Sequence, residues 1–318
     1  MSTAAIVVSG VCKSYGGVRA VTDLDFTVPE GSVCGFLGPN GSGKTTTIRM
    51  IMSILYPDSG TITVRGIPAG PKAQDLIGYL PEERGLYPKM KVGELLTYFA
   101  ALKNAGADGP RRIKYWLQRV ELEAWADKKV NELSKGMQQK IQFIVSVLAD
   151  PPLLILDEPS SGLDPVNANV LKDILLELRA AGKTILFSTH RMEEAERICD
   201  HIYMINRGRK VLDGTLAAVK AGAGQSAARI EFRGDGSLLR QAPGVREVED
   251  YGNYAEMRLS AEAQGAEIVR FLAPRLDITR FELLEPSLNQ IFLEKVSQGD
   301  AAYAENSDRR EAGVPAAG

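Results

Sequence analysis

Residues 38–45 read Gly38-Pro39-Asn40-Gly41-Ser42-Gly43-Lys44-Thr45 and match the phosphate-binding loop pattern G-x-x-x-x-G-K-[ST] at every fixed position. An apolar run, Val33 to Leu37, comes directly before the loop and predicts a strand. The residues that follow predict a helix from Thr45 to Ser53. Strand, glycine-rich turn and helix in this order predict a nucleotide-binding domain of the α/β class, because backbone amides and a helix N-terminus together attract phosphate.

The residue types in this loop suit a triphosphate and its metal ion. Glycines let the backbone approach the phosphates, so that several N–H groups converge on the anion. Lys44 adds a mobile positive charge, and Thr45 offers a hydroxyl to Mg²⁺, a hard ion that prefers oxygen ligands. We therefore predict that the residues from Gly38 to Thr46 bind ATP with Mg²⁺.

Composition limits the other kinds of partner. The chain has 318 residues, 44% of them hydrophobic, which predicts one large domain with a smaller one. A formal net charge of −2 disfavours a basic binding surface, so we expect no nucleic-acid partner. Because no run of about 18 apolar residues and no basic N-terminal leader occur, we expect neither a membrane span nor export. The three cysteines are far apart and fit a reducing cytosol: Cys12, Cys34 and Cys199.

The order of the short apolar runs predicts the architecture of the larger domain. From Ala5 to about Ala221, β-branched runs alternate with helical patterns, which predicts an α/β domain with a mostly parallel core sheet. The first sixty residues hold several strands but no long helix before the loop, which predicts an antiparallel β part. A helical insertion is predicted between Val92 and Val120. Five apolar residues form a stripe along one face of the first predicted helix, and this stripe packs against either the core or a partner: Val92, Leu95, Leu96, Phe99 and Leu102.

A flexible stretch of small residues, 221–227, predicts a domain boundary. We therefore expect a nucleotide-binding domain at residues 1–221, a small α+β domain at 228–297 and a disordered tail at 298–318. The predicted strands of the small domain are Arg229–Phe232, Gly244–Tyr251, Tyr254–Leu259 and Ile278–Leu284. Its predicted helices are Ala261–Ala273 and Leu288–Val296.

Two acidic residues follow an apolar strand further along the chain. The strand predicted at Leu153 to Leu156 ends in Asp157-Glu158-Pro159, at the strand end where open α/β sheets bind ligands. Asp157 is predicted to hold Mg²⁺, and Glu158 to orient and deprotonate the attacking water. The alternative, an ordinary acidic turn, is disfavoured by the phosphate loop upstream.

A third motif, Leu133-Ser134-Lys135-Gly136-Met137-Gln138-Gln139-Lys140, opens a helix predicted to run to about Ala149. It resembles the signature motif of ABC-type ATPases, whose Leu-Ser-x-Gly-x core stands at this place between the other two motifs. Ser134, the N–H of Gly136 and the helix N-terminus would form a second anion site. For this segment alone, an ordinary serine-capped helix is the alternative.

The resemblance extends to three further features. Ser161-Gly162-Leu163-Asp164-Pro165 resembles the family's D-loop, which implies that Asp164 communicates across a dimer interface. His190 resembles the switch histidine that contacts the γ-phosphate, and Tyr15 the aromatic residue that stacks on adenine. Simple packing is the alternative for Tyr15, and a satisfied core or surface histidine for His190.

One position departs from the family pattern. Most members carry a glutamine that reaches Mg²⁺ and senses the γ-phosphate, where this chain reads Pro81-Glu82-Glu83-Arg84. A carboxylate at Glu82 can still ligate Mg²⁺, although it adds negative charge beside a polyanion. Arg84 is placed to offset that charge. We therefore predict that Glu82 binds both the metal ion and the nucleotide.

The resemblance to ABC-type ATPases covers the chain from Ala5 to about Ala221. A later segment, from Glu285 to Leu293, resembles the ending of the single-domain ATP-binding subunits of bacterial exporters. The Pro81–Arg84 variant looks most like the sodium and multidrug exporter subgroup, which has an extra C-terminal domain. This implies a cytoplasmic ATPase on the inner face of the membrane, working with a separate integral membrane permease. Docking is expected near Glu82 to Tyr87 and the Val92 helix.

The family also implies how the two anion sites work together. In it, each ATP is held by the phosphate loop of one subunit and the signature motif of another, in a head-to-tail dimer. The second subunit is either a copy of this chain or a paralogous ATPase. One rival function is a soluble ABC-type ATPase that clamps ribosomes or DNA, and another is a small-molecule kinase. The signature motif and the Ser161 to Pro165 loop disfavour the kinase.

Overall fold

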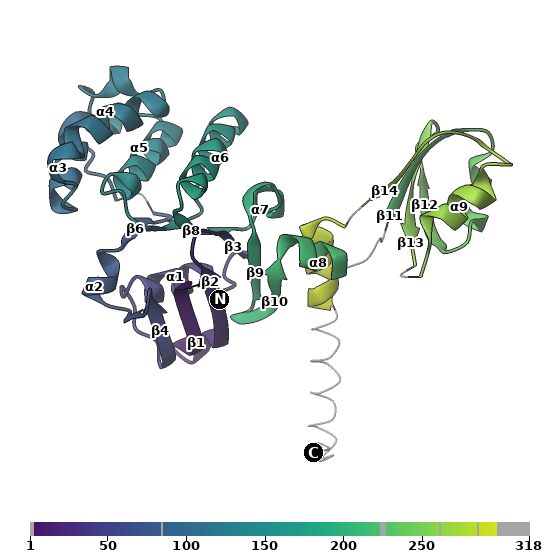
Figure 1. The fold of residues 1–318 in the computed structure, drawn as a ribbon, viewed down its shortest axis with the longest axis horizontal. Coiled ribbons are helices and arrows are strands. Elements are labelled where there is room, and N and C mark those ends of the chain that lie inside the picture. The colour runs from purple at the N-terminus through teal and green to yellow at the C-terminus, as the bar shows by residue number, and fades with distance from the viewer. Residues whose placement is uncertain (1–2, 84, 223–226, 261, 285, 298–318) are drawn as a thin grey trace, which may run out of the picture. The chain divides into compact units, whose positions relative to one another are not determined.

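The computed structural model describes residues 3–83, 85–222, 227–260, 262–284 and 286–297 (Figure 1). The chain divides into two compact units, residues 1–214 and 215–318. Helix α8 (Leu216–Gly222) falls in the second unit. The domain limits expected at 1–221 and 228–297 stay predictions, and the tail expected at 298–318 lies outside the described residues. No helix in the described ranges is long and apolar enough to cross a membrane.

A six-stranded sheet of the order β10-β9-β3-β8-β7-β6 forms the centre of the first unit. Its strands are β3 (Val33–Leu37), β6 (Ile77–Leu80), β7 (Leu153–Asp157), β8 (Thr184–Thr189), β9 (His201–Asn206) and β10 (Arg209–Thr215). The pairs β3·β8, β3·β9, β6·β7 and β7·β8 are parallel. Strands β3, β7 and β8 are buried along their whole length, as their apolar runs predict. Neighbouring parallel strands end at one edge, so the loops after β3, β8, β7 and β6 meet there.

The antiparallel part is a second sheet of the order β2-β1-β4-β5. Its strands are β1 (Ala4–Tyr15), β2 (Val18–Pro29), β4 (Ser59–Val64) and β5 (Ile67–Pro68). Residues from both sheets share one apolar core, in which Phe26 of β2 lies 5.2 Å from Phe36 of β3 and 5.0 Å from Tyr203 of β9 between ring centroids. Ile48 and Met50 of α1 (Lys44–Ile51) belong to the same core, which fixes the helix that follows the phosphate loop.

The helical insertion contains α3 (Val92–Leu102), α4 (Gly109–Arg119) and α5 (Lys135–Val147), which pack on one another (Figure 1). Short helices α2 (Pro71–Gln74) and α7 (Met192–Ile198) and the longer α6 (Pro165–Ala180) complete the unit. The stripe predicted on α3 is correct for Val92, Leu95 and Leu96, which are buried. Phe99 is partly buried and Leu102 is 61% exposed, so for the end of the stripe the partner-facing alternative stays a prediction.

The second unit contains a four-stranded antiparallel sheet of the order β12-β13-β11-β14. Its strands are β11 (Ala227–Arg233), β12 (Val245–Asp250), β13 (Tyr254–Leu259) and β14 (Asp277–Leu284). A 3₁₀ helix, η4 (Gly236–Gln241), follows β11, and α9 (Gly265–Leu272) follows β13, which gives a ferredoxin-like connectivity. Helix α9 begins later than predicted, because Gln264 has an extended backbone and serves as its N-cap. A further helix spans residues 288–297.

Candidate nucleotide site

The phosphate loop joins β3 to α1 and depends on glycine. Gly43 has φ +106° and stands at the N-cap of α1, which begins at Lys44, one residue earlier than predicted. A Cβ atom at Gly43 would lie 2.6 Å from the Ala20 carbonyl oxygen. The loop therefore has both a left-handed backbone and a close backbone approach that only glycine allows.

Lys44 is buried beneath this loop, with 5% of its surface exposed. Its Nζ donates to the carbonyl oxygens of Gly38 at 2.7 Å and Pro39 at 3.2 Å. The same atom lies 3.7 Å from Glu158 Oε1. Burial lowers the pKa of Lys44, and the charges of Glu158 and Asp157 oppose that shift. The loop thus holds a desolvated cation beside the predicted catalytic carboxylate.

Asp157 ends β7 and is fully buried. Ser188 of the neighbouring β8 donates its hydroxyl to Asp157 Oδ1 and accepts the Glu158 N–H at 3.0 Å. Burial raises the pKa of Asp157, and the hydroxyls of Ser188 and Thr45 oppose the shift. Ser188 was not predicted from the sequence, where its only signal is its place two residues before His190 at the end of an apolar strand.

Glu158 lies between Lys44 and His190. His190 Nδ1 is 3.0 Å from both carboxylate oxygens of Glu158, and the Glu158 side chain is 8% exposed. The backbone of Glu158 has φ +49°, a left-handed conformation that costs free energy in a residue with a side chain and occurs often at functional sites. The structure therefore brings together the two residues that the sequence predicts to be catalytic.

Glu82 follows β6 and reaches the start of α1. The Thr45 hydroxyl lies 3.4 Å from Glu82 Oε2, and the charges of Glu82 and Glu158 both raise the pKa of Asp157. The Oδ2 atom of Asp157 is buried and has no hydrogen-bond partner among the described residues. A cluster of carboxylate and hydroxyl oxygens with one oxygen left unpaired fits a hard divalent ion such as Mg²⁺.

The signature segment belongs to the helical insertion, at the start of α5. Ser134 is the N-cap of α5 and accepts the Met137 N–H at 3.2 Å. A Cβ atom at Gly136 would lie 3.3 Å from the Gly162 carbonyl oxygen, so the start of α5 contacts the loop that precedes α6. No hydrogen bond recorded for the described residues joins Ser134 or Gly136 to the group around Lys44.

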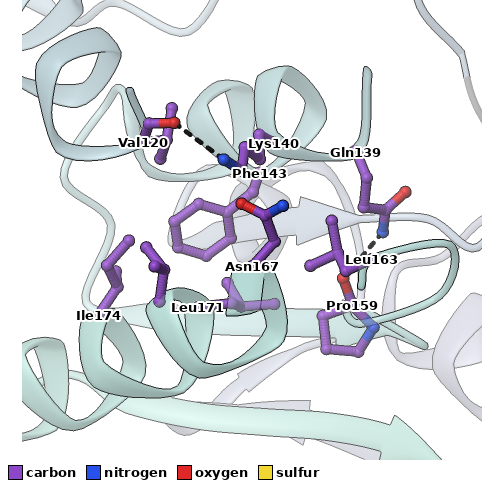
Figure 2. Close-up of a pocket in the computed structure, with 10 residues that line it drawn as sticks. Val120, Gln139, Lys140, Phe143, Pro159, Leu163, Asn167, Leu171 and Ile174 are labelled. Atoms are coloured by element: carbon purple, nitrogen blue, oxygen red, sulfur yellow. Dashed lines mark hydrogen bonds between the residues drawn. The ribbon is translucent and has the colours of Figure 1, made fainter. Parts of the chain in front are cut away.

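The D-loop packs against α5 as well. Asp164 is the N-cap of α6 and accepts the Asn167 N–H at 2.9 Å, a bond that lowers the pKa of Asp164. Beside it, Leu163 and Asn167 line a small apolar pocket between α5 and α6, together with Phe143 (Figure 2). Gln139 closes one side of this pocket, donating to the Pro159 carbonyl at 3.1 Å (Figure 2).

Two further features concern the predicted Tyr15 and the loops that follow β7 and β8. Tyr15 ends β1 and is 46% exposed, with Lys13 Nζ 5.8 Å from its ring centroid, and its contact with adenine stays a prediction. Glu194 of α7 accepts the Ser160 hydroxyl at 2.7 Å and the Arg191 guanidinium at 2.8 Å, and so ties the loop after Glu158 to the loop after His190. This link could not be predicted from the sequence, since no pattern along the chain marks it.

Comparison with known proteins agrees with this geometry. The family model described as ABC transporter matches residues 21–161. The ABC transporter ATP-binding protein YhaQ of Bacillus subtilis (strain 168) is 42% identical over 292 residues, which cover 92% of this chain and 98% of that protein. The chain belongs to the ABC transporter ATP-binding proteins. A second model, for the C-terminal domain of ATP-binding proteins like DrrA1-3, matches residues 214–296.

Two other ABC proteins extend the comparison. The Nod factor export ATP-binding protein I of Burkholderia orbicola (strain AU 1054) is 41% identical over 223 residues, 69% of this chain and 73% of that protein. The dimeric post-hydrolysis structure of the ATP-binding cassette MJ0796, bound to ADP and Pi, has a TM-score of 0.62 at 25% identity, covering 66% of this chain and 98% of that chain. The predicted ABC-type α/β fold is confirmed, and the chain is an ABC ATPase that binds and hydrolyses ATP.

Proposed function

We propose that this ABC ATPase drives an exporter, and that two copies, or this chain and a paralogue, close head to tail around two MgATP. The observation that carries the proposal is that the two anion-binding elements belong to different parts of the fold: Ser134 caps α5 of the helical insertion, whereas Lys44 follows β3 of the core sheet and lies beside Glu158. A second subunit would bring its Ser134 to the phosphates held by Lys44. The relative named for Nod factor export and the dimeric cassette support this function.

The residues around Lys44 suit hydrolysis in such a dimer. The Lys44 ammonium would leave the Gly38 and Pro39 carbonyls for phosphate oxygens, which carry full charge. Glu158 would accept the proton of the attacking water, while His190 holds the carboxylate from its outer side. Thr45, Asp157 and Glu82 would hold Mg²⁺, which supplies charge stabilisation at the phosphates.

The energetic logic follows from differential binding. Each ATP would contact one subunit in the open form and two in the closed form, so it stabilises the closed dimer by that difference in affinity. Loss of the γ-phosphate removes contacts that span the two subunits, and the dimer reopens. The alternation supplies the mechanical work for a separate integral membrane permease, to which the ATPase docks on the inner face of the membrane.

An aromatic cluster beside α3 is the surface we propose for that permease. Tyr87 and Tyr98 meet edge to face with ring centroids 5.8 Å apart, and Phe99 lies 6.2 Å from Tyr87. Both tyrosines are exposed, as is Leu102 at the end of α3. Exposed aromatic rings gathered in one place are typical of protein interfaces. The cluster also lies five residues from Glu82 along the chain, so docking there can influence the nucleotide site.

Trapping the dimer tests the proposal. Glu158→Gln should keep nucleotide binding but block hydrolysis, so that MgATP converts the monomer to a stable dimer in size-exclusion chromatography with light scattering. Adding Ser134→Arg to Glu158→Gln should abolish the dimer, because a large cation would replace the hydroxyl at the start of α5. A Glu158→Gln protein that stays monomeric with MgATP, alone and with a candidate permease, would falsify the dimer mechanism.

A further inference from the structure

Gln142 lies in the buried part of α5 and is 4% exposed. Its Nε2 atom donates to two backbone carbonyls, that of Pro81 at 3.0 Å and that of Glu83 at 3.2 Å. These carbonyls stand immediately before and after Glu82. One side-chain amide therefore holds the segment that carries Glu82 against α5 from both sides.

Packing alone does not account for a glutamine at this position. The Oε1 atom of Gln142 is buried and has no hydrogen-bond partner among the described residues. Its neighbours Ile141, Phe143 and Ile144 are buried apolar residues. A buried polar atom without a partner costs free energy, so leucine or methionine would suit the core better. What Gln142 adds is the pair of hydrogen bonds to the segment around Glu82.

The segment that Gln142 holds in place leads to the predicted metal site. Glu82 Oε2 lies 3.4 Å from the Thr45 hydroxyl, and its charge contributes to the field at Asp157. Gln142 itself lies on α5, about two turns after Ser134, the N-cap residue of this helix. A single rigid helix therefore carries both the signature serine and the side chain that holds Glu82 in place.

We propose that Gln142 is a positioning residue for the metal site, which fixes Glu82 beside Thr45 and so links Mg²⁺ binding to α5. The inference rests on the metal-binding role proposed for Glu82. Gln142 acts only through the backbone of the 81–83 segment, since its recorded hydrogen bonds within the described chain go to Pro81 and Glu83. Removing the bonds frees this segment and lowers the fraction of molecules in which Glu82 stands beside Thr45.

The test is the Mg²⁺ dependence of nucleotide binding by the full chain. Binding of a non-hydrolysable ATP analogue is measured across free Mg²⁺ concentrations, with the protein dilute enough to stay monomeric. Gln142→Leu should raise the Mg²⁺ concentration for half-maximal binding about three- to tenfold, the effect of losing roughly one net hydrogen bond. Gln142→Met, which keeps an unbranched side chain of similar length, should give the same shift and guards against misfolding of the leucine variant.

Gln138→Leu is the matched control. Gln138 Nε2 also donates to two carbonyls, those of Val130 and Leu133, both at 3.1 Å, but neither belongs to the Glu82 segment. Each leucine variant removes two hydrogen bonds made by a glutamine of α5, so an effect of loosening that helix in general would appear in both. Only the Gln142 variants should shift the Mg²⁺ dependence. Equal shifts in Gln138→Leu and Gln142→Leu would show that Gln142 is merely structural and overturn the inference.

Glu82→Ala separates failure of the inference from failure of its premise. This variant should shift the Mg²⁺ dependence at least as far as Gln142→Leu, and the double variant should go no further, because both changes act through one carboxylate. A shift in Glu82→Ala with none in either Gln142 variant overturns the inference alone. No shift in Glu82→Ala removes the metal role of Glu82 and the inference with it, while the dimer proposal stands.

Discussion

The two units of this ABC ATPase differ in what they bury. Among the residues that the structure describes, all buried ones with a charged, amide or aliphatic hydroxyl side chain lie in the first unit. Several surround the nucleotide site: Ser42, Lys44, Asp157, Glu158, Ser188 and Thr189. The buried residues described in the second unit are apolar, such as Phe232 and Met257. Because polar groups cost free energy when buried, their confinement to one unit marks where the fold serves chemistry rather than stability.

The ion pairs show the same difference. Lys44 and Glu158 are 6% and 8% exposed, and their charges lie 3.7 Å apart in a desolvated site. In the second unit, Arg258 and Glu247 pair at 3.1 Å across β13 and β12, with 71% and 65% of their side chains exposed. A buried pair leaves an uncompensated charge when one partner is removed, whereas an exposed pair is replaced by water. Substitutions in the two units should therefore have very different effects on ATP turnover.

The largest effect is expected from Glu158→Gln, measured as steady-state phosphate release. The amide cannot accept a proton from the attacking water, so turnover should fall by about 10² to 10⁴, the usual contribution of a general base. The variant keeps the size of the side chain near Lys44 and His190, so nucleotide binding should remain. Glu282→Gln, on an exposed strand of the second unit, is the control and should leave turnover unchanged. Normal turnover in Glu158→Gln would remove this residue from its assigned role.

A smaller effect is expected from Glu82→Gln. Its amide oxygen can replace one carboxylate oxygen near the Thr45 hydroxyl, so ATP turnover should stay within roughly tenfold of the unmodified protein. Steady-state hydrolysis at saturating Mg²⁺ measures this. If turnover were almost completely lost, the negative charge of Glu82 would have a role that an amide cannot fill. The expectation that Glu158→Gln loses more turnover than Glu82→Gln would then be wrong.

Phe232→Ala should change stability but hardly turnover. Phe232 is 4% exposed in the core of the second unit, and truncating such a side chain costs about 3–5 kcal/mol. Calorimetry should show unfolding at a lower temperature, whereas ATP turnover measured at low temperature should stay within about twofold of that of the unmodified protein. Phe36→Ala, in the core beneath the phosphate loop, is the matched variant and should lower turnover as well. Equal losses of turnover in both would mean that the second unit takes part in the ATPase reaction.

The sequence predicts those parts of the site whose residues are contiguous. The phosphate loop, Asp157 with Glu158, and His190 each sit at the end of a strand whose apolar run is visible in the chain, and the order of the parallel strands brings these ends together. The contact of His190 with Glu158 follows from the same topology. Local pattern was sufficient to find each motif, because each carries its own strand, whereas the strand order that brings them together comes from the structure.

The contacts between distant segments could not be predicted in the same way. Gln142 holds a segment some 60 residues earlier in the chain, and Ser188 bonds to Asp157 across two strands. In each case the partner is set by tertiary packing, which single-sequence periodicity does not encode. A glutamine between two apolar residues, as Gln142 is between Ile141 and Phe143, was nevertheless a signal that the sequence offered.

The smallest effect is expected from Arg258→Ala in the second unit. Its partner Glu247 is exposed and becomes solvated when the arginine is removed, and exposed pairs contribute little because water and salt screen them. Neither the melting temperature nor ATP turnover should change measurably, at low or at physiological salt. A clear loss of turnover would mean that the charged face of this sheet makes a contact during the ATPase cycle. The first unit would then not be the only one of the two that takes part in ATP turnover.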